Sequence, residues 1–136
     1  MPADNFTIKI FTPNGLLLED ISNDVKIPTL EGQINVLPNH AKYVGVLSVG
    51  IVEYLSHPLR ETHKIVVSDG LCSFEDDCVT ILADEAVHKD DINLATLEEE
   101  ERALASALAN AEQYTVKSAK RLAYLQAQET VLKNTN

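Results

Sequence analysis

The stretch IPTLEGQINVLPNHAKYVGVLSVGIVEYL, residues 27–55, decides the fold class of this chain. It contains short runs in which apolar and polar residues alternate, separated by Gly, Pro and Asn, and this period of two residues is typical of β-strands. The same pattern extends over residues 5–87, with no Gly-rich phosphate loop and no alternation of strands with helices. We therefore expect an antiparallel β-sandwich or barrel for this part of the chain.

The hydrophobic period changes after residue 88. Residues 94–134 contain neither Pro nor Gly, and Ala, Leu, Glu, Gln and Lys, which favour helices, dominate the segment. We predict two helices joined by a turn at residues 110–115, with Thr96 as the N-cap of the first helix and with acidic residues 98–100 near its positive end. Apolar residues at helical spacing mark the expected inner faces: Leu97, Leu104, Leu108 and Ala111 in the first helix, and Val116, Ala119, Ala123 and Ala127 in the second. Two helices alone bury little apolar surface, so this antiparallel hairpin is expected either to lean on another surface or to be able to come away from it.

The net charge of the chain limits the kinds of partner that it can bind. The formal charge is -10 at pH 7, and such an acidic balance disfavours binding to nucleic acids and to anionic lipid surfaces. The sequence also contains neither a signal or transit peptide nor an apolar run of the length that crosses a bilayer, about 18 residues. We therefore expect that the chain does not insert directly into a membrane. We also expect its partners to be proteins of basic or mixed charge.

The two cysteines are expected to be reduced thiols. If the segment around them is a β-hairpin that turns at residues 76–77, Cys72 lies opposite Ile81, and Cys78 lies opposite Glu75 on the other face. Thiols on opposite faces cannot form a disulfide bond, and no pair of histidines accompanies them to build a zinc site.

The histidines and the adjacent carboxylates do not form a recognisable catalytic or metal-binding pattern. The four histidines lack the spacing of a metal motif, and no nucleophile elbow is present. The carboxylate pairs Asp84–Glu85 and Asp90–Asp91 are expected to be solvated or to cap helices rather than to act as acid and base. His40, at the end of a strand, can either hold a turn by hydrogen bonds or carry a reaction, and the first role is more common for such a corner. The histidines are His40, His57, His63 and His88.

Two segments of the sequence, taken together, resemble one known family. EGQINVLPNHAKYVGVLSVGIVEY, residues 31–54, and VSDGLCSFEDDCVTILADEAVHKDDIN, residues 67–93, are similar to the hallmark segments of the epsilon subunit of F-type ATP synthases. The resemblance covers nearly the whole chain in order. It implies a ten-stranded antiparallel β-sandwich in residues 1–88, followed by a regulatory antiparallel two-helix hairpin in residues 89–136.

The resemblance also implies a function and a docking surface. It implies a non-catalytic subunit of the central stalk that couples the catalytic head to the rotor ring of c subunits, without a cofactor. The turn and corner that would dock the sandwich to the c ring and the gamma subunit comprise Glu31, Gly32, Gln33, Pro38, Asn39 and His40. The expected location is the cytoplasmic face of a bacterial inner membrane or, alternatively, the stromal face of a thylakoid. A free-standing β-sandwich adaptor with a helical binding arm is the alternative.

For the second helix, the resemblance implies a regulatory contact. In many members the hairpin extends along gamma, meets an acidic stretch of the beta subunit within the alpha–beta ring, and impedes ATP hydrolysis. The basic residues available for such a contact are Lys117, Lys120, Arg121 and Lys133. The same residues can equally be a solvated face that keeps the hairpin soluble.

The chain departs from the family at two positions. Some members bind ATP through an Ile/Leu-Asp-x-x-Arg-Ala motif, but here Asn93, Thr96 and Leu97 replace its Asp, Arg and Ala, so we expect no nucleotide site. The family's Gly-Gly pair is replaced by Asp69-Gly70, and Asp tolerates a positive φ better than most residues.

Overall fold

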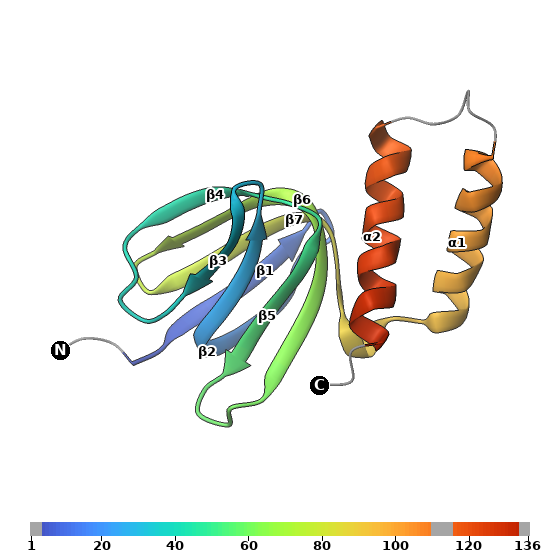
Figure 1. Cartoon of the computed structure of the whole chain (residues 1–136). Helices are drawn as coiled ribbons and strands as arrows, with labels where there is room; N and C mark the ends of the chain where they lie inside the picture. Colours follow the sequence, from blue (N-terminus) through green and yellow to red (C-terminus); the bar gives the residue numbers. More distant parts are fainter. Residues whose placement is uncertain (1–3, 110–115, 134–136) are drawn as a thin grey trace.

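The computed structural model describes residues 4–109 and 116–133, which form a β-sandwich flanked by two helices (Figure 1). The predicted turn at residues 110–115 lies outside the described residues. Seven strands are followed by a short 3-10 helix, η1, and two α-helices: β1 Phe6–Thr12, β2 Gly15–Thr29, β3 Gly32–Val36, β4 Tyr43–Leu47, β5 Gly50–Ser56, β6 Thr62–Glu75, β7 Cys78–His88, η1 Lys89–Asp91, α1 Leu94–Leu108 and α2 Val116–Lys133.

The strands form a single mixed sheet that folds back on itself. Its order is β1-β7-β6-β4-β2-β3, β5 pairs with both β2 and β6, and β1 also pairs with β2. The alternation predicted from the sequence is confirmed in β1, where Phe6, Ile8 and Ile10 are buried and the residues between them are partly exposed. The predicted hairpin at residues 76–77 is also confirmed, because Cys72 pairs with Ile81.

The predicted number and direction of the strands were wrong. The sandwich contains seven strands rather than ten, and β1 runs parallel to β7. The difference in number arises because long strands pass from one layer to the other without a break: β2 pairs first with β1 and then with β3 and β5, and β6 pairs first with β5 and then with β4. The alternating pattern continues through such a bend, so the sequence does not show where a strand changes its partner.

The main hydrophobic core is contributed by the strands alone. Its buried members extend from Phe6 to Ala83, and the largest of them include Tyr54, Ile27 and Leu47. A second, smaller cluster joins the sheet to α2 through Val66, with Tyr124 and Val131 buried against it. The sandwich therefore closes its own core, and the helices add a separate contact.

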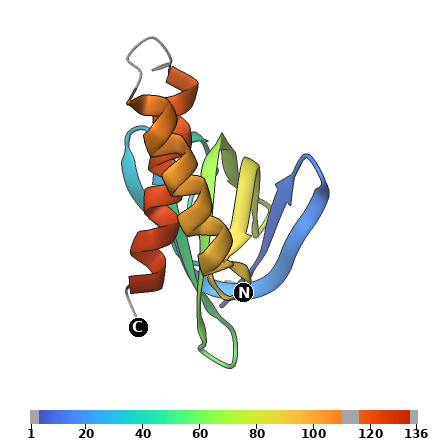
Figure 2. The same ribbon diagram turned by 90° about the vertical axis from the view of Figure 1, so that its right-hand side faces the viewer.

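The two helices run in opposite directions beside the sandwich, and α2 is the helix that contacts the sheet (Figures 1 and 2). The expectation that the helices lean on another surface is thus confirmed. None of the helices in the described residues has the length and apolar character needed to cross a lipid bilayer.

The predicted start of α1 was wrong. Its N-cap is Asn93, whose side chain accepts a hydrogen bond from the backbone N–H of Thr96 at 3.1 Å. With the helix beginning at Leu94, its first turn contains no acidic residue, so residues 98–100 lie beyond the positive end of the helix dipole.

The predicted inner face of α2 was also partly wrong. Val116 is 74% exposed, whereas Tyr124, Leu125 and Val131 are buried. The alanines face partly inward, but the larger side chains next to them make the contacts with the sheet and with α1 because they bury more apolar surface. In α1, Leu97 is buried as predicted, and Ala111 lies outside the described part of the chain.

Candidate functional site

The first predicted docking element is the tight turn between β2 and β3. Thr29 pairs with Gly32 across the turn, and the Thr29 hydroxyl donates to the carbonyl of Gly32 at 2.5 Å and accepts from the N–H of Glu31 at 3.2 Å. Gly32 has φ +116°, and a Cβ at this position would meet no other atom within 4 Å. The N–H of Leu30 donates to the carbonyl of Val46 in β4. The turn is therefore a fixed projection with the exposed side chains of Leu30 and Glu31 at its tip.

The second predicted docking element is the corner at residues 37–40. The N–H of His40 donates to the carbonyl of Leu37 at 3.1 Å, and Asn39 has φ +67°, which together with Pro38 gives a type II turn. The His40 Nδ1 lies 2.6 Å from the carbonyl oxygen of Ala41, and the ring packs edge-on against Phe74. These contacts match the turn-holding role that the sequence allowed for His40.

The structure does not bring the turn and the corner together. Strand β3 separates them, so they lie at opposite ends of a five-residue strand, a length of about 14–17 Å. The resemblance implied a single docking surface that contains both. A docking surface that contains both elements therefore has to extend over at least this distance.

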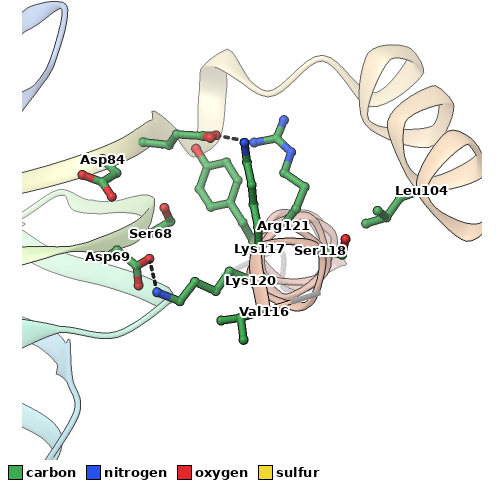
Figure 3. A pocket seen from close by; sticks show the side chains of 11 residues that line it. Ser68, Asp69, Asp84, Leu104, Val116, Lys117, Ser118, Lys120 and Arg121 are labelled. Carbon is green, nitrogen blue, oxygen red and sulfur yellow. Dashed lines mark hydrogen bonds and ion pairs between the residues drawn. The ribbon is translucent and has the colours of Figure 1, made fainter. Parts of the chain in front are cut away.

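Three of the four predicted basic residues on α2 make ion pairs within the chain. Lys120 Nζ lies 2.9 Å from a carboxylate oxygen of Asp69 on β6, and Figure 3 shows it reaching across the gap between helix and sheet. Arg121 forms ion pairs with Glu85 on β7 and Glu100 on α1. Arg121 therefore ties together the sheet and both helices.

The other two predicted basic residues of α2 are Lys133 and Lys117. Lys133 pairs with Glu129 one turn earlier in the same helix, with 2.6 Å between nitrogen and oxygen. Lys117 is exposed and lines a cleft of about 560 Å³ between the two helices and the inner part of β6 and β7, together with Lys120, Arg121 and the acidic Asp69 (Figure 3).

The electrostatics around Arg121 favour this closed arrangement. Burial by itself lowers the pKa of the guanidinium, but the hydrogen bonds that it donates to Glu100 and Glu85 outweigh burial and raise the pKa overall. The same guanidinium lies over the ring of Tyr124, 5.5 Å from its centre. Burial, followed by the nearby Glu85 charge, raises the pKa of the Tyr124 hydroxyl to about 12. The hydroxyl is therefore neutral at physiological pH, and Glu85 acts as an ion-pair partner rather than as the solvated acid expected from the sequence.

Two of the residues that replace the nucleotide motif stabilise the fold of this chain. Asn93 caps α1, and Leu97 is buried. They line a depression of about 210 Å³ whose lining residues include the acidic Asp91 and Glu100 but no Lys or Arg. Phosphate groups require positive charge or free N–H groups, so this depression does not suit a nucleotide.

The cysteines and carboxylates show no arrangement for a metal ion. Within residues 4–109 and 116–133, no group of three or more histidine, cysteine or carboxylate side chains is placed to bind one. Cys72 is buried, Cys78 is partly exposed, and both are free thiols, as predicted. Burial raises the pKa of the Cys72 thiol, which keeps it protonated and unreactive.

Sequence reasoning missed an apolar stripe on the outer face of the sheet. Residues that pair across neighbouring strands share a face, and a row of such pairs crosses five strands: Val46 with Leu71, Leu71 with Leu82, Leu82 with Phe11, and Phe11 with Leu16. Four of these five side chains are between 46% and 52% exposed. A contiguous exposed apolar row of this kind is a candidate protein interaction surface.

The sequence did carry a signal for this stripe. In β4 the residues on both faces are apolar: Tyr43 and Leu47 point toward the core, while Val44 and Val46 point outward. A strand whose two faces are both apolar is typical of a sheet that is covered on both sides. Only the register of the neighbouring strands shows that the outward residues align into a row.

Comparison with known proteins gives a consistent result. The sequence profile described as "ATP synthase, Delta/Epsilon chain, beta-sandwich domain" matches residues 5–89. The ATP synthase epsilon chain of Desulfitobacterium hafniense (strain Y51) is 33% identical over 92 residues, which cover 68% of each chain. The chloroplastic ATP synthase epsilon chain of Bigelowiella natans is 30% identical over 105 residues, 77% of each chain. A chain in the Euglena gracilis mitochondrial ATP synthase structure has the same fold, with a TM-score of 0.81 at 21% identity, over 97% of this chain and 84% of that one.

Proposed function

The chain belongs to the epsilon-subunit family of F-type ATP synthases, and from this premise we propose that it works as a docking and regulatory subunit of the central stalk. In this role it performs no chemistry. It links the gamma subunit to the c ring through its sandwich, and its helices regulate ATP hydrolysis through the beta and alpha subunits. The complex would lie at the cytoplasmic face of a bacterial inner membrane or the stromal face of a thylakoid.

The observation that carries the docking proposal is the apolar stripe. Its row of half-exposed side chains lies on a rigid sheet, so a partner can cover it with little loss of conformational entropy. We assign this stripe to the gamma subunit. The projecting turn at residues 29–33, with its acidic Glu31 and exposed Leu30, is assigned to the c ring. The corner at residues 37–40, at the other end of β3 from this turn, is assigned to the same docking surface for the c ring and gamma.

The gamma assignment predicts the effect of a charge in the stripe. Leu82→Glu places a carboxylate where the partner would bury a leucine, and burial of a leucine side chain contributes about 1.5–3 kcal/mol. We expect the affinity for gamma to fall at least about tenfold in a co-purification or titration experiment. Leu59→Glu is the matched control, since Leu59 is 75% exposed and lies outside the stripe. Equal affinities of the two variants would remove the stripe from the interface, and a chain that never binds gamma would favour the free-standing adaptor.

The regulatory proposal rests on the ion pairs of α2. Lys120 and Arg121 are engaged with Asp69, Glu85 and Glu100 while the hairpin lies on the sandwich. An acidic stretch of the beta subunit could pair with these two side chains only after the hairpin has left the sheet. The docked hairpin is therefore the form that does not inhibit, and its internal acidic partners compete with the beta subunit.

Removal of the hairpin tests the regulatory proposal separately. A chain that ends after His88 keeps every member of the main core, so we expect it to fold and to assemble with gamma. ATP hydrolysis by the isolated complex is expected to rise several-fold, because the inhibitory contact is lost. Unchanged hydrolysis in a fully assembled complex would reject the regulatory role and leave the docking role intact.

A further inference from the structure

Strands β6 and β7 bend at one point, where Asp69 and Asp84 interrupt their register. In β6, Val67 and Cys72 both belong to the main core although an odd number of positions separates them, so the alternation of faces is reset once between them. β6 pairs with β5 up to Val67 and with β4 from Gly70 onward. The bend contains two consecutive residues with positive φ, Asp69 at +22° and Gly70 at +150°. At these two residues β6 therefore passes from one layer of the sandwich to the other.

The two sides of this bend carry different surfaces. Before the bend, Val66 on the outward face of β6 belongs to the cluster that seats α2. After the bend, Leu71 on the outward face belongs to the apolar stripe. Asp69 thus lies on the border between the seat of the hairpin and the surface assigned to gamma.

Helix α2 offers one cation to each strand of the bend. Lys120 pairs with Asp69 on β6 at 2.9 Å, and its neighbour Arg121 pairs with Glu85 on β7 (Figure 3). Carboxylates at facing positions of a sheet, such as those of Asp69 and Asp84, repel each other, and the ammonium group of Lys120 offsets this repulsion. The bend therefore holds the hairpin by charge, in addition to the apolar contact between α2 and the sheet.

Asp69 occupies a position where the backbone favours glycine. Glycine adopts a positive φ without the steric cost that a residue with a Cβ carries, although Asp tolerates this region better than most residues. The ion pair of Asp69 reaches a residue of α2 rather than a residue of the sandwich. Strained residues cluster at switch regions, where the strain is part of the mechanism. The position of Asp69 is therefore explained by its contact with the hairpin.

We propose that Asp69 is a latch residue: through its ion pair with Lys120, it sets the fraction of chains whose hairpin is docked on the sandwich. Both side chains are partly exposed, 55% for Lys120 and 32% for Asp69, and an ion pair of this kind contributes little free energy. The latch therefore tunes the docked population by a few-fold and does not lock the hairpin. A weak latch suits a hairpin that has to leave the sheet in order to inhibit, and this consequence rests on the regulatory role proposed above.

Amide hydrogen exchange of the free chain tests the latch. Asp69→Asn keeps the shape of the side chain and its tolerance of a positive φ, but it removes the negative charge. We expect exchange in residues 116–133 to accelerate roughly two- to fivefold, the range for a partly exposed ion pair, and exchange in β1 to stay unchanged. The difference from the parent chain is expected to shrink at high salt, because salt screens the ion pair of the parent.

Asp76→Asn is the matched control for the change in charge. Asp76 also has a positive φ, +54°, but it lies in the turn between β6 and β7, at the other end of β6 from the bases of the helices. This variant is expected to leave exchange in α2 at the level of the parent chain. Equal exchange of α2 in the Asp69→Asn and Asp76→Asn variants would overturn the proposal.

A double-mutant cycle tests whether Asp69 acts through Lys120. Lys120→Met keeps an apolar stem and a similar helix propensity but has no ammonium group. We expect Lys120→Met to accelerate exchange in α2 to a similar extent, and the double variant to exchange no faster than the faster of the two single variants. Additive effects, or faster exchange in β1 as well as in α2, would contradict the latch. These measurements need no other subunit, so the latch can fail while the regulatory role stands, and removal of the hairpin tests that role separately.

Discussion

Gly70→Ala is expected to destabilise the sandwich by about 4 kcal/mol or more, so that much of the protein is unfolded at 37 °C. Gly70 lies in β6 with φ +150°, a region that side chains with a Cβ rarely adopt. A Cβ at this position would also lie 1.8 Å from the carbonyl oxygen of Leu82 on the neighbouring strand. That oxygen belongs to the backbone of β7, so the clash is relieved only if the two central strands separate.

The control for this prediction is Gly15→Ala. Gly15 has a similar positive φ of +112°, but no atom lies within 4 Å of the place that a Cβ would occupy, and only backbone strain of about 1–2 kcal/mol is expected. Urea unfolding of both variants, followed by circular dichroism, separates the clash from the strain. Equal losses of unfolding free energy would show that the strands can move apart at little cost.

Tyr124→Ala is expected to detach the hairpin while the sandwich stays folded. The Tyr124 ring is buried against Val66 and supports the Arg121 guanidinium, and truncation of a buried aromatic residue costs about 3–5 kcal/mol. The small cluster between α2 and the sheet has few other buried members, so this loss exceeds what the remaining contacts can compensate. The main core contains no residue of either helix and is expected to be unaffected.

Amide hydrogen exchange measures the two parts of this prediction separately. In Tyr124→Ala, we expect protection to fall by at least about a hundredfold in residues 116–133 and to remain unchanged in β1 and β6. Tyr124→Phe keeps the ring and removes only the hydroxyl, so it is expected to retain protection in α2. If exchange accelerated equally in the sandwich, the two clusters would unfold as one unit. In the assembled complex, the detached hairpin of Tyr124→Ala is expected to strengthen inhibition, which is the opposite of removing the hairpin.

The parts of the fold that depend on local pattern were predictable. The alternation in β1 fixes which residues enter the core, because successive side chains of a strand point to opposite faces. The pair of Asp residues at 76–77, both with positive φ, fixes the register of the β6–β7 hairpin, and with it the separation of the two thiols. The second predicted helix is confirmed as α2, because Ala, Leu, Gln, Lys and Arg, which favour helices, dominate its sequence.

The parts that depend on which segments meet were not predictable. Asn93 rather than Thr96 caps α1, since either side chain can accept the hydrogen bond and the position of η1 decides between them. The basic residues of α2 looked like a single solvated or partner-binding face, but the docking of α2 on the sheet gives Lys120 and Arg121 acidic partners far away in the sequence.

By itself, the sequence determined the strand-forming and helix-forming parts of this protein, the residues that alternate into the core, and membership of the epsilon family, because periodicity and local motifs act between near neighbours. Only the tertiary structure decided that seven long strands replace ten and that the stripe through Leu71 and Leu82 is continuous. Each of these features depends on strand pairing between distant segments, and pairing is selected by the closure of the whole core rather than by any short stretch of chain.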